Sequence, residues 1–305
     1  MLVVVALGGN ALLRRGEPLE AAVQRRNLLA AVARSIGPLA RTHEVVITHG
    51  NGPQIGLLAL QAASYRPLRP DPLDVLGAES EGMIGYLIEQ ALAGELPGHE
   101  LATLLTQVEV DLADPAFAAP TKPIGPTYGA AEAERLARET GWRFLQDGAG
   151  WRRAVPSPMP QRIREINAIR LLVRGGATVI CAGGGGIPVA VGADGSLSGV
   201  EAVIDKDHSA ALLAEELGAD ALLLLTDVPA VWTRWPMSEG VPIGHISVAA
   251  LRRFTFAPGS MAPKVAAACR FAERTGRLAA IGALDDAEAM LAGTAGTILG
   301  GGAGG

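Results

Sequence analysis

The chain has 305 residues, of which 49% are hydrophobic and 19% are charged, and its formal net charge at pH 7 is −5. This acidic balance argues against a nucleic acid or an anionic membrane as the main partner, so a local cluster of charges would have to hold any anionic substrate. The apolar content is ample for a large core, yet no apolar stretch approaches the length of a membrane span.

The cysteines and the N-terminal segment bear on the compartment. Cys181 and Cys269 have no metal-ligand spacing, so we expect both to be buried apolar residues in a reducing environment. Residues 1–7 are apolar, but they are too few for a signal peptide and lack its basic start. The sequence therefore predicts a soluble cytoplasmic protein with no membrane or nucleic-acid partner.

The first two predicted strands each end in a small polar turn. Residues 2–7 form a valine-rich run, typical of a strand buried on both faces of a parallel sheet, and Gly8-Gly9-Asn10 follows it. A helix is expected over 19–39, then a strand over 44–48 that ends in His49-Gly50-Asn51-Gly52-Pro53. Open α/β sheets bind ligands at the carboxyl ends of their strands, so both turns are candidate sites. His49 could act as a base, although we expect it to be hydrogen-bonded to backbone.

The middle of the chain contains a segment of different character. Helices are predicted over residues 54–63 and 74–93, followed by a third strand over 101–110. Proline clusters bound the segment from about 111 to 160, which carries Lys122 within the stiff sequence PTKPIGP. We interpret this segment as a small protruding subdomain. It is either a lid that carries Lys122 over a site or a surface flap that only caps the core edges.

Four consecutive glycines follow the next predicted helix and strand, which cover residues 161–174 and 177–182. Glycine loses more conformational freedom on folding than any other residue, so ordering Gly183 to Gly186 is costly. Because both flanks are strongly apolar, the run is not a linker. We expect it where backbone meets a ligand.

The stretch from residue 199 to 228 organises the rest of the chain. Val203 and Ile204 stop at Asp205-Lys206-Asp207, where a helix pattern begins that ends at Gly218, and a strand predicted over 221–225 ends in Thr226-Asp227. A helix N-terminus favours anions through its free N–H groups and its dipole, and here it would orient a lysine between two aspartates. The alternative is a helix cap by Asp205 or Asp207 beside a surface lysine.

The last third completes the pattern. The sequence GSMAPK, residues 259–264, opens a helix over 265–275, and strands near 278–281 and 297–299 close the sheet, before a disordered tail over 301–305. Strand, glycine-rich loop and helix repeat from end to end. This order predicts one domain, a three-layer α/β sandwich with a mainly parallel central sheet.

Lysine is rare in this chain. Of 26 basic residues only three are lysines, Lys122, Lys206 and Lys264, and each lies in a Pro- or Gly-rich loop or at an element junction. A chain this biased toward arginine keeps lysine where the compact ammonium is needed, so we expect these three to be active-site cations. Lysines, a carboxylate and dense backbone N–H groups, without a Ser/His/Asp triad or a metal cluster, favour phosphoryl transfer.

Eight motifs carry a family resemblance. VVALGGNAL, VITHGNGPQIG, EGMIGYLIEQ, PTKPIGP, GGGGIPV, GVEAVIDKD, LLTDV and APGSMAPK resemble, in order and spacing, the motifs of carbamate kinases in the amino-acid-kinase family, from residue 2 to about 300. The resemblance implies reversible conversion of ATP and carbamate to ADP and carbamoyl phosphate, by a homodimer. It implies Mg²⁺ held mainly by nucleotide phosphates, a carbamate-binding lobe over 1–200 and a nucleotide-binding lobe over 201–300.

The resemblance also implies roles for single residues. Lys206 and Lys264 would contact the transferring phosphoryl group, Asp207 would orient them, and Lys122 would reach in from the protruding subdomain. Carbamate already carries an anionic oxygen, so no catalytic base is needed. The implied carbamate- and phosphate-binding residues are Gly8, Gly9, Asn10, Gly50, Asn51, Gly52, Gly184 and Gly185. The implied nucleotide-binding residues are Thr226, Asp227, Val228, Trp232, Met261 and Lys264.

Three departures and two alternatives remain open. His208, Trp232 and Ala262 stand where relatives commonly have other residues, and each bears on nucleotide affinity more than on reaction type. The first alternative is another small-acid kinase of the same family, of the acetylglutamate type. The second is a nucleotide-binding regulatory module with an inactive site, against which the intact lysines and Asp207 argue.

Overall fold

The computed structural model of the protein describes residues 1–13, 17–18, 20–66, 70–234, 237–256 and 261–301. Residues 302–305 of the expected tail, and Gly259 and Ser260 of the expected helix-opening turn, lie outside the described residues. The Gly301 N–H donates a hydrogen bond to the Gly276 carbonyl oxygen at 3.4 Å, so the described end of the tail is bonded to the fold.

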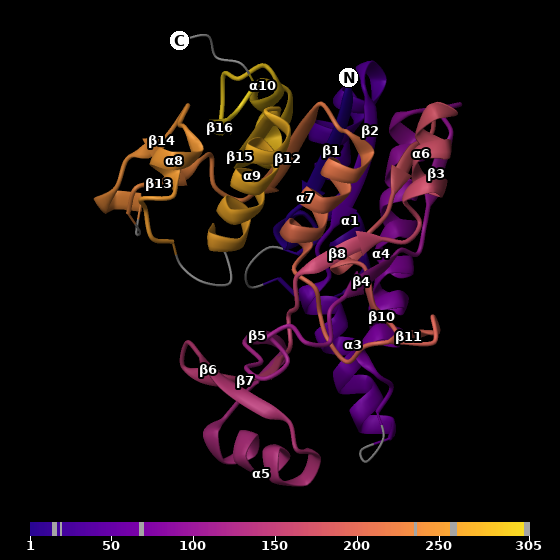
Figure 1. Ribbon diagram of the computed structural model, residues 1–305, viewed down its shortest axis with the longest axis vertical. Coiled ribbons are helices and arrows are strands. Elements are labelled where there is room, and N and C mark those ends of the chain that lie inside the picture. Colours follow the sequence, from indigo (N-terminus) through magenta and orange to yellow (C-terminus); the bar gives the residue numbers. More distant parts are fainter. Residues whose placement is uncertain (14–16, 19, 67–69, 235–236, 257–260, 302–305) are drawn as a thin grey trace.

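Within the described chain, a seven-stranded sheet forms the centre of the molecule, in the order β16-β15-β12-β1-β2-β9-β3 (Figure 1). All its neighbouring pairs are parallel except β15 and β16, which are antiparallel. The mainly parallel sheet that the sequence predicted is therefore confirmed. Its strands are β1 (Leu2–Leu7), β2 (Glu44–His49), β3 (Leu101–Thr103), β9 (Thr178–Ile180), β12 (Ala221–Thr226), β15 (Leu278–Ala283) and β16 (Thr297–Leu299).

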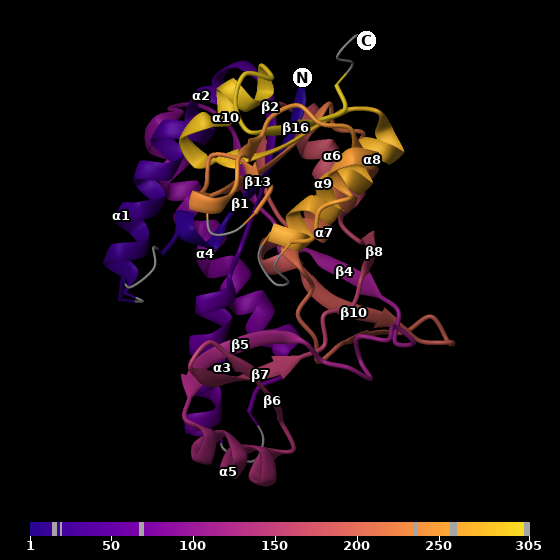
Figure 2. The ribbon, with the colours of Figure 1, turned by 90° about the vertical axis from the view of Figure 1, so that its left-hand side faces the viewer.

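Each face of this sheet has its own hydrophobic core, because alternate residues of a strand point to opposite faces. On β1, Val3 and Val5 belong to one core and Val4 and Ala6 to the other. Helices cover both faces (Figure 2), so the predicted three-layer sandwich is confirmed. The first core is covered by α1 (Ala21–Ala31), the π-helical segment η2 (Val32–Ile36), α2 (Gly37–Thr42), α4 (Leu73–Glu95) and α10 (Ala287–Leu291), and the second by α6 (Ile166–Arg174), α7 (Lys206–Leu217) and α9 (Met261–Thr275).

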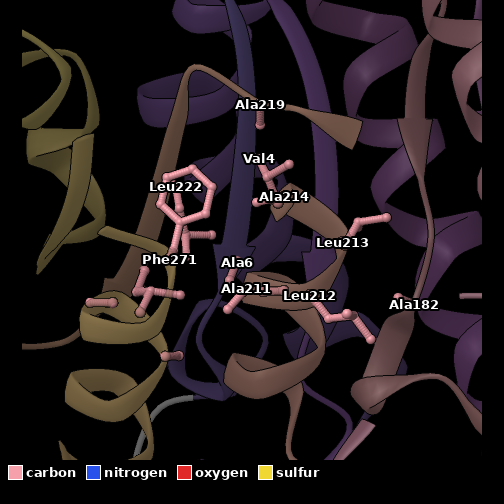
Figure 3. Packing of buried hydrophobic residues seen from close by; sticks show 14 of the residues in the cluster. Val4, Ala6, Ala182, Ala211, Leu212, Leu213, Ala214, Ala219, Leu222 and Phe271 are labelled. Carbon is pink, nitrogen blue, oxygen red and sulfur yellow. The ribbon is translucent and has the colours of Figure 1, made fainter. Parts of the chain in front are cut away.

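The second core brings α7 and α9 onto the sheet (Figure 3). Ala211 and Ala214 of α7 lie over β1, where their small side chains let the helix approach the strand closely. Phe271 of α9 is completely buried and fills the space beside Leu222 of β12. This packing fixes two helices side by side, and both bear on the site described below.

A second sheet, in the order β11-β10-β4-β8, corrects two predictions. The single strand expected over 101–110 is wrong, because the Thr106 N–H between β3 and β4 donates to the Glu81 carboxylate at 3.2 Å instead of to a strand. The helix expected over 161–174 begins only at Ile166, because the residues before it pair with β4 as strand β8. The strands are β4 (Gln107–Val110), β8 (Pro160–Ile163), β10 (Ile187–Val191) and β11 (Leu197–Gly199).

A third, antiparallel sheet, in the order β5-β7-β6, stands away from the main body together with one helix (Figures 1 and 2). The chain leaves the second sheet at Val110 and returns to it at Pro160, and these two residues are paired. A Cβ on Gly56 of α3 would lie 2.6 Å from the Gly125 Cα of β5, so α3 and this sheet meet closely. The elements are α3 (Gly52–Tyr65), β5 (Lys122–Tyr128), α5 (Ala130–Thr140), β6 (Arg143–Asp147) and β7 (Gly150–Val155).

The remaining described elements are short. Strands β13 (Val231–Trp232) and β14 (Pro242–Ile243) form an antiparallel pair, and α8 (Val248–Leu251) follows them. Both cysteines are free and buried, as expected. In the described part of the chain, none of the helices combines the length and the apolar character needed to cross a membrane.

Candidate active site

The first turns of α7 and α9 lie at the carboxyl edge of the main sheet. Each helix leads into a parallel strand, α7 into β12 and α9 into β15, so each N-terminus lies at the edge where the strands end. Lys206 is the first residue of α7, and Lys264 lies in the first turn of α9. The turns after β1 and β2 lie at the same edge.

The start of α7 is capped by Asp205. Its Oδ1 accepts a hydrogen bond from the Asp207 N–H at 3.0 Å, so of the two aspartates that the sequence offered as caps, the structure selects Asp205. The Asp207 side chain is then available to the lysines. Lys206 Nζ donates to Asp207 Oδ1 at 2.5 Å, and Lys264 Nζ donates to Oδ2 at 2.9 Å. One buried carboxylate therefore holds two ammonium groups from two helices.

Burial and charge act differently on the two lysines. Burial lowers the pKa of Lys206 to about 8, and the Lys264 charge acts in the same direction, although Asp207 opposes both. Burial would also lower the pKa of Lys264, but the Asp207 charge and hydrogen bond outweigh it and raise that pKa. Burial would raise the pKa of Asp207, but the two lysines hold it below its usual value. Of the two lysines, Lys206 is therefore the one that loses its proton first as pH rises.

Lys122 reaches the same helix start from β5. Its Nζ lies 2.5 Å from Asp205 Oδ2, and 28% of the Lys122 side chain is exposed. Burial would raise the pKa of Asp205, but the charge and hydrogen bond of Lys122 hold it well below its usual range. This contact brings the protruding segment to the start of α7, while its role as a lid stays a prediction.

The turns after β1 and β2 contact each other, and the second of them lies beside Lys206. The Gly50 N–H donates to the Leu7 carbonyl oxygen at 3.1 Å. A Cβ on Gly50 would lie 3.4 Å from Gly9 N and 3.4 Å from Lys206 Cδ. Asn10 lies in the short 3-10 helix Gly9–Ala11 that follows β1. Of the glycines that the sequence predicted as binding turns, Gly50 therefore lies beside Lys206, and Gly9 lies beside Gly50.

The four-glycine run packs against protein atoms. Gly184, Gly185 and Gly186 have φ angles of 67°, 100° and 83°, in the left-handed region that favours glycine. A Cβ on Gly184 would lie 2.1 Å from Asn51 Nδ2, and one on Gly185 would lie 2.4 Å from the Ile204 carbonyl oxygen. The run thus supports the β2 turn and the segment that leads into α7, while contact of Gly184 and Gly185 with a ligand stays a prediction.

The sequence and the structure are similar to those of known proteins. Residues 1–282 match the model of the amino acid kinase family. The chain belongs to the amino acid kinase family. It is 55% identical over 302 residues to the carbamate kinase of Rhizobium meliloti (strain 1021), covering 98% of this chain and 93% of that protein. It is 53% identical to the carbamate kinase of Haemophilus influenzae, covering 97% and 96%. Carbamate kinase from Giardia lamblia bound to AMP-PNP is structurally similar, with a TM-score of 0.89 and 38% identity over 99% of this chain and 98% of that one.

This amino acid kinase has a buried carboxylate that the sequence did not assign to the site. Glu81 of α4 accepts hydrogen bonds from the Gly183 N–H at 2.8 Å and from the Thr106 N–H at 3.2 Å. Burial raises the pKa of Glu81 to about 8, although these two N–H groups favour its charged form. The sequence contained one signal that could have identified Glu81. It is a carboxylate inside the motif EGMIGYLIEQ, on the helix face that also carries the buried Ile84 and Ile88.

The residues expected at the nucleotide lie on β12, β13 and α9 or directly after β12. Thr226 ends β12 at the carboxyl edge, with Asp227 and Val228 following it, and Met261 begins α9. Trp232 lies on β13, and its Nε1 is buried without a hydrogen-bond partner among the described residues. The same is true of His208 Nδ1 in the first turn of α7. Both atoms belong to residues that we interpret, from the sequence, as departures from the family pattern.

Proposed function

We propose that this amino acid kinase is a carbamate kinase, which transfers a phosphoryl group reversibly between ATP and carbamate to give ADP and carbamoyl phosphate. The observation that carries the proposal is the Asp207 carboxylate with Lys206 and Lys264 on its two oxygens. The identity of 55% to a carbamate kinase, over nearly the whole of both chains, supports the choice of substrate.

Charge neutralisation accounts for the chemistry. Phosphoryl transfer spreads negative charge over the equatorial oxygens of the transferring group, and preorganised cations stabilise that charge. Lys206 and Lys264 supply the cations, Asp207 fixes their direction, and Lys122 adds a third ammonium beside the α7 N-terminus. Carbamate attacks through an oxygen that is already anionic, so no side chain has to remove a proton.

The glycine turns and the β12 end complete the proposed site. We assign carbamate and the transferring group to the backbone at Gly8 to Asn10 and Gly50 to Gly52, because Gly50 lies beside Lys206 and Gly9 lies beside Gly50. We assign the nucleotide to Thr226 to Val228, Trp232 and Met261. The lobes over 1–200 and 201–300, the protruding subdomain over 111–160, the homodimer and the cytoplasmic location are parts of the same proposal.

The described side chains contain no cluster suited to a dedicated magnesium site. Among the described residues, no group of three or more His, Cys, Asp or Glu side chains could hold a metal ion. The two carboxylates at the α7 start, Asp205 and Asp207, are already paired with lysines. We therefore propose that Mg²⁺ enters bound to the nucleotide phosphates.

ATP formation from ADP, Mg²⁺ and carbamoyl phosphate, read by luminescence, tests the proposal. We expect rapid ATP formation by the wild-type protein and its collapse in Lys206→Ala. Arg138→Ala is the matched control, because it removes a cation whose side chain is 72% exposed on α5, away from the lysine cluster. A folded wild-type protein that binds nucleotide and makes no ATP would contradict the proposal, and turnover with other small acids would then separate another acid kinase from a regulatory module.

A further inference from the structure

His49 is the last residue of β2, and its side chain is completely buried. Its ring nitrogen Nδ1 lies 3.2 Å from the carbonyl oxygen of Gly50. A carbonyl oxygen only accepts a hydrogen bond, so Nδ1 carries the proton and Nε2 carries the lone pair. Burial lowers the pKa of His49 to about 4, with the hydrogen bond to Gly50 opposing and the charge of Lys206 assisting, so the ring is neutral near pH 7.

The second ring nitrogen gains no hydrogen bond from the protein. His49 Nε2 is buried and lacks a partner in the described part of the chain. It faces Gly183, where a Cβ would lie only 2.2 Å away. A buried polar atom without a partner costs about 1–3 kcal/mol, which offsets the roughly 0.5–1.5 kcal/mol that the Nδ1–H hydrogen bond contributes. A net gain in stability therefore does not explain a histidine at the end of β2.

Gly50 connects the His49 ring to Lys206. Its N–H donates to the Leu7 carbonyl oxygen, and a Cβ on Gly50 would meet Gly9 N at 3.4 Å and the Cδ and Cε atoms of Lys206 at 3.4 and 3.5 Å. A shift of Gly50 would therefore move the turn after β1 or the stem of Lys206. The only hydrogen bond that the structure gives the His49 side chain is the one to the Gly50 carbonyl, among the described residues.

We propose that His49 is a positioning residue whose Nδ1–H holds the Gly50 carbonyl and thereby fixes the turn against which Lys206 packs. The ring does not touch the reacting atoms and exchanges no proton during turnover. The role rests on the proposed function, because that function assigns Lys206 to the transferring phosphoryl group.

Three substitutions at this position separate the two ring nitrogens. Asparagine places an N–H donor where His49 has Nδ1, glutamine places its amide where His49 has Nε2, and leucine supplies neither. We expect His49→Leu and His49→Gln to lower kcat by about 10- to 100-fold, as for a small misplacement of a reacting group, with little change in the KM for ADP. We expect His49→Asn to keep most of the wild-type kcat and His49→Leu to keep the wild-type Tm. Wild-type kcat in His49→Leu, or no advantage of asparagine over glutamine, would overturn the proposal.

A second variant tests the same ring from the opposite side. In Gly183→Ala the new Cβ would push the His49 ring off the Gly50 carbonyl, so kcat should fall in the wild-type background. It should fall less in the His49→Asn background, because asparagine ends short of the Nε2 position. Equal losses in both backgrounds would overturn the role of His49. Absence of ATP formation by the wild-type protein would overturn the proposed function and this role with it, whereas an unaffected His49→Leu would overturn the role alone.

Discussion

Lys122 and Asp205 are 83 positions apart in the sequence, yet the Lys122 ammonium lies 2.5 Å from the Asp205 carboxylate. The other oxygen of the same carboxylate caps α7 by accepting the Asp207 N–H. Asp205 thus joins the protruding sheet to the helix that carries Lys206. Its cap and its charge are separate functions, and two substitutions distinguish them.

Asp205→Asn keeps a side-chain oxygen for the cap and removes the charge that holds Lys122, whereas Asp205→Ala removes both. An N-cap side chain contributes about 0.5–2 kcal/mol, so we expect the alanine variant to be the less stable of the two by roughly that amount. Both variants should lose kcat, because both release Lys122. Chemical denaturation beside the ATP assay measures the two effects, and equal stability of the two variants would contradict the assignment of the cap.

Lys264→Ala should lower kcat by on the order of 10²- to 10³-fold, the size of effect seen when one stabiliser of transition-state charge is removed. Lys206→Arg should recover little activity, because a planar guanidinium does not replace the compact ammonium that Lys206 points at Asp207 Oδ1. Steady-state kinetics of both variants check these outcomes. Full activity of Lys206→Arg would discard the argument from the scarcity of lysine.

The pKa of Lys206, about 8 in the folded chain, predicts the alkaline limb of the pH profile. If the ammonium is the active form, kcat/KM falls as pH rises through about 8, and kcat/KM reports the free enzyme. The contribution of Lys206 to stability does not explain such a fall. An unfolded lysine titrates near 10.5, so between about 8 and 10.5 the unfolded chain binds more protons, and the contribution of Lys206 to stability rises with pH. A flat kcat/KM between pH 7 and 9 would contradict this role.

Glu81 has the opposite effect on stability, because its pKa is raised, from 4.5 to about 8. Between these values the folded chain binds more protons than the unfolded chain, so the contribution of this group to stability falls as pH rises. Glu81→Gln cannot titrate. We therefore expect the Tm of the wild type to fall relative to that of Glu81→Gln as pH rises from about 5 to about 8, by calorimetry at matched ionic strength. A constant Tm difference over this range would show that Glu81 is ionised throughout.

The sequence predicted the parts of this fold whose signals are local. The apolar run of β1, the helix pattern after Asp205 and the glycine turn after β2 each depend on adjacent residues, and each lies where it was expected. The scarcity of lysine also identified three side chains that do meet at one helix start. That signal is compositional, so distance along the chain did not hide it.

The errors share a different cause, which is partner choice between distant segments. The sequence predicts β3 and β4 as one apolar strand, and the hydrogen bond from the Thr106 N–H to Glu81 of α4 divides them. The sequence of residues Pro160–Ile163 gives no strong strand signal. The segment is a strand because it pairs with β4. The sequence showed that the glycine run loses much conformational entropy on folding. The atoms that leave no room for a side chain there, Asn51 Nδ2 and the Ile204 carbonyl oxygen, belong to other segments.

The contact between Gly56 and Gly125 gives the last prediction, because it is where α3 supports the sheet that carries Lys122. A Cβ on Gly56 would lie 2.6 Å from Gly125 Cα, a backbone atom that cannot rotate away, so Gly56→Ala should push β5 off α3. Lys122 begins β5, so we expect kcat to fall toward that of Lys122→Ala. Gly94→Ala on α4 is the matched control, because its Cβ would meet no described atom within 4 Å and alanine favours a helix by up to about 1 kcal/mol. If Gly56→Ala and Gly94→Ala have the same kcat, the position of Lys122 does not depend on this contact.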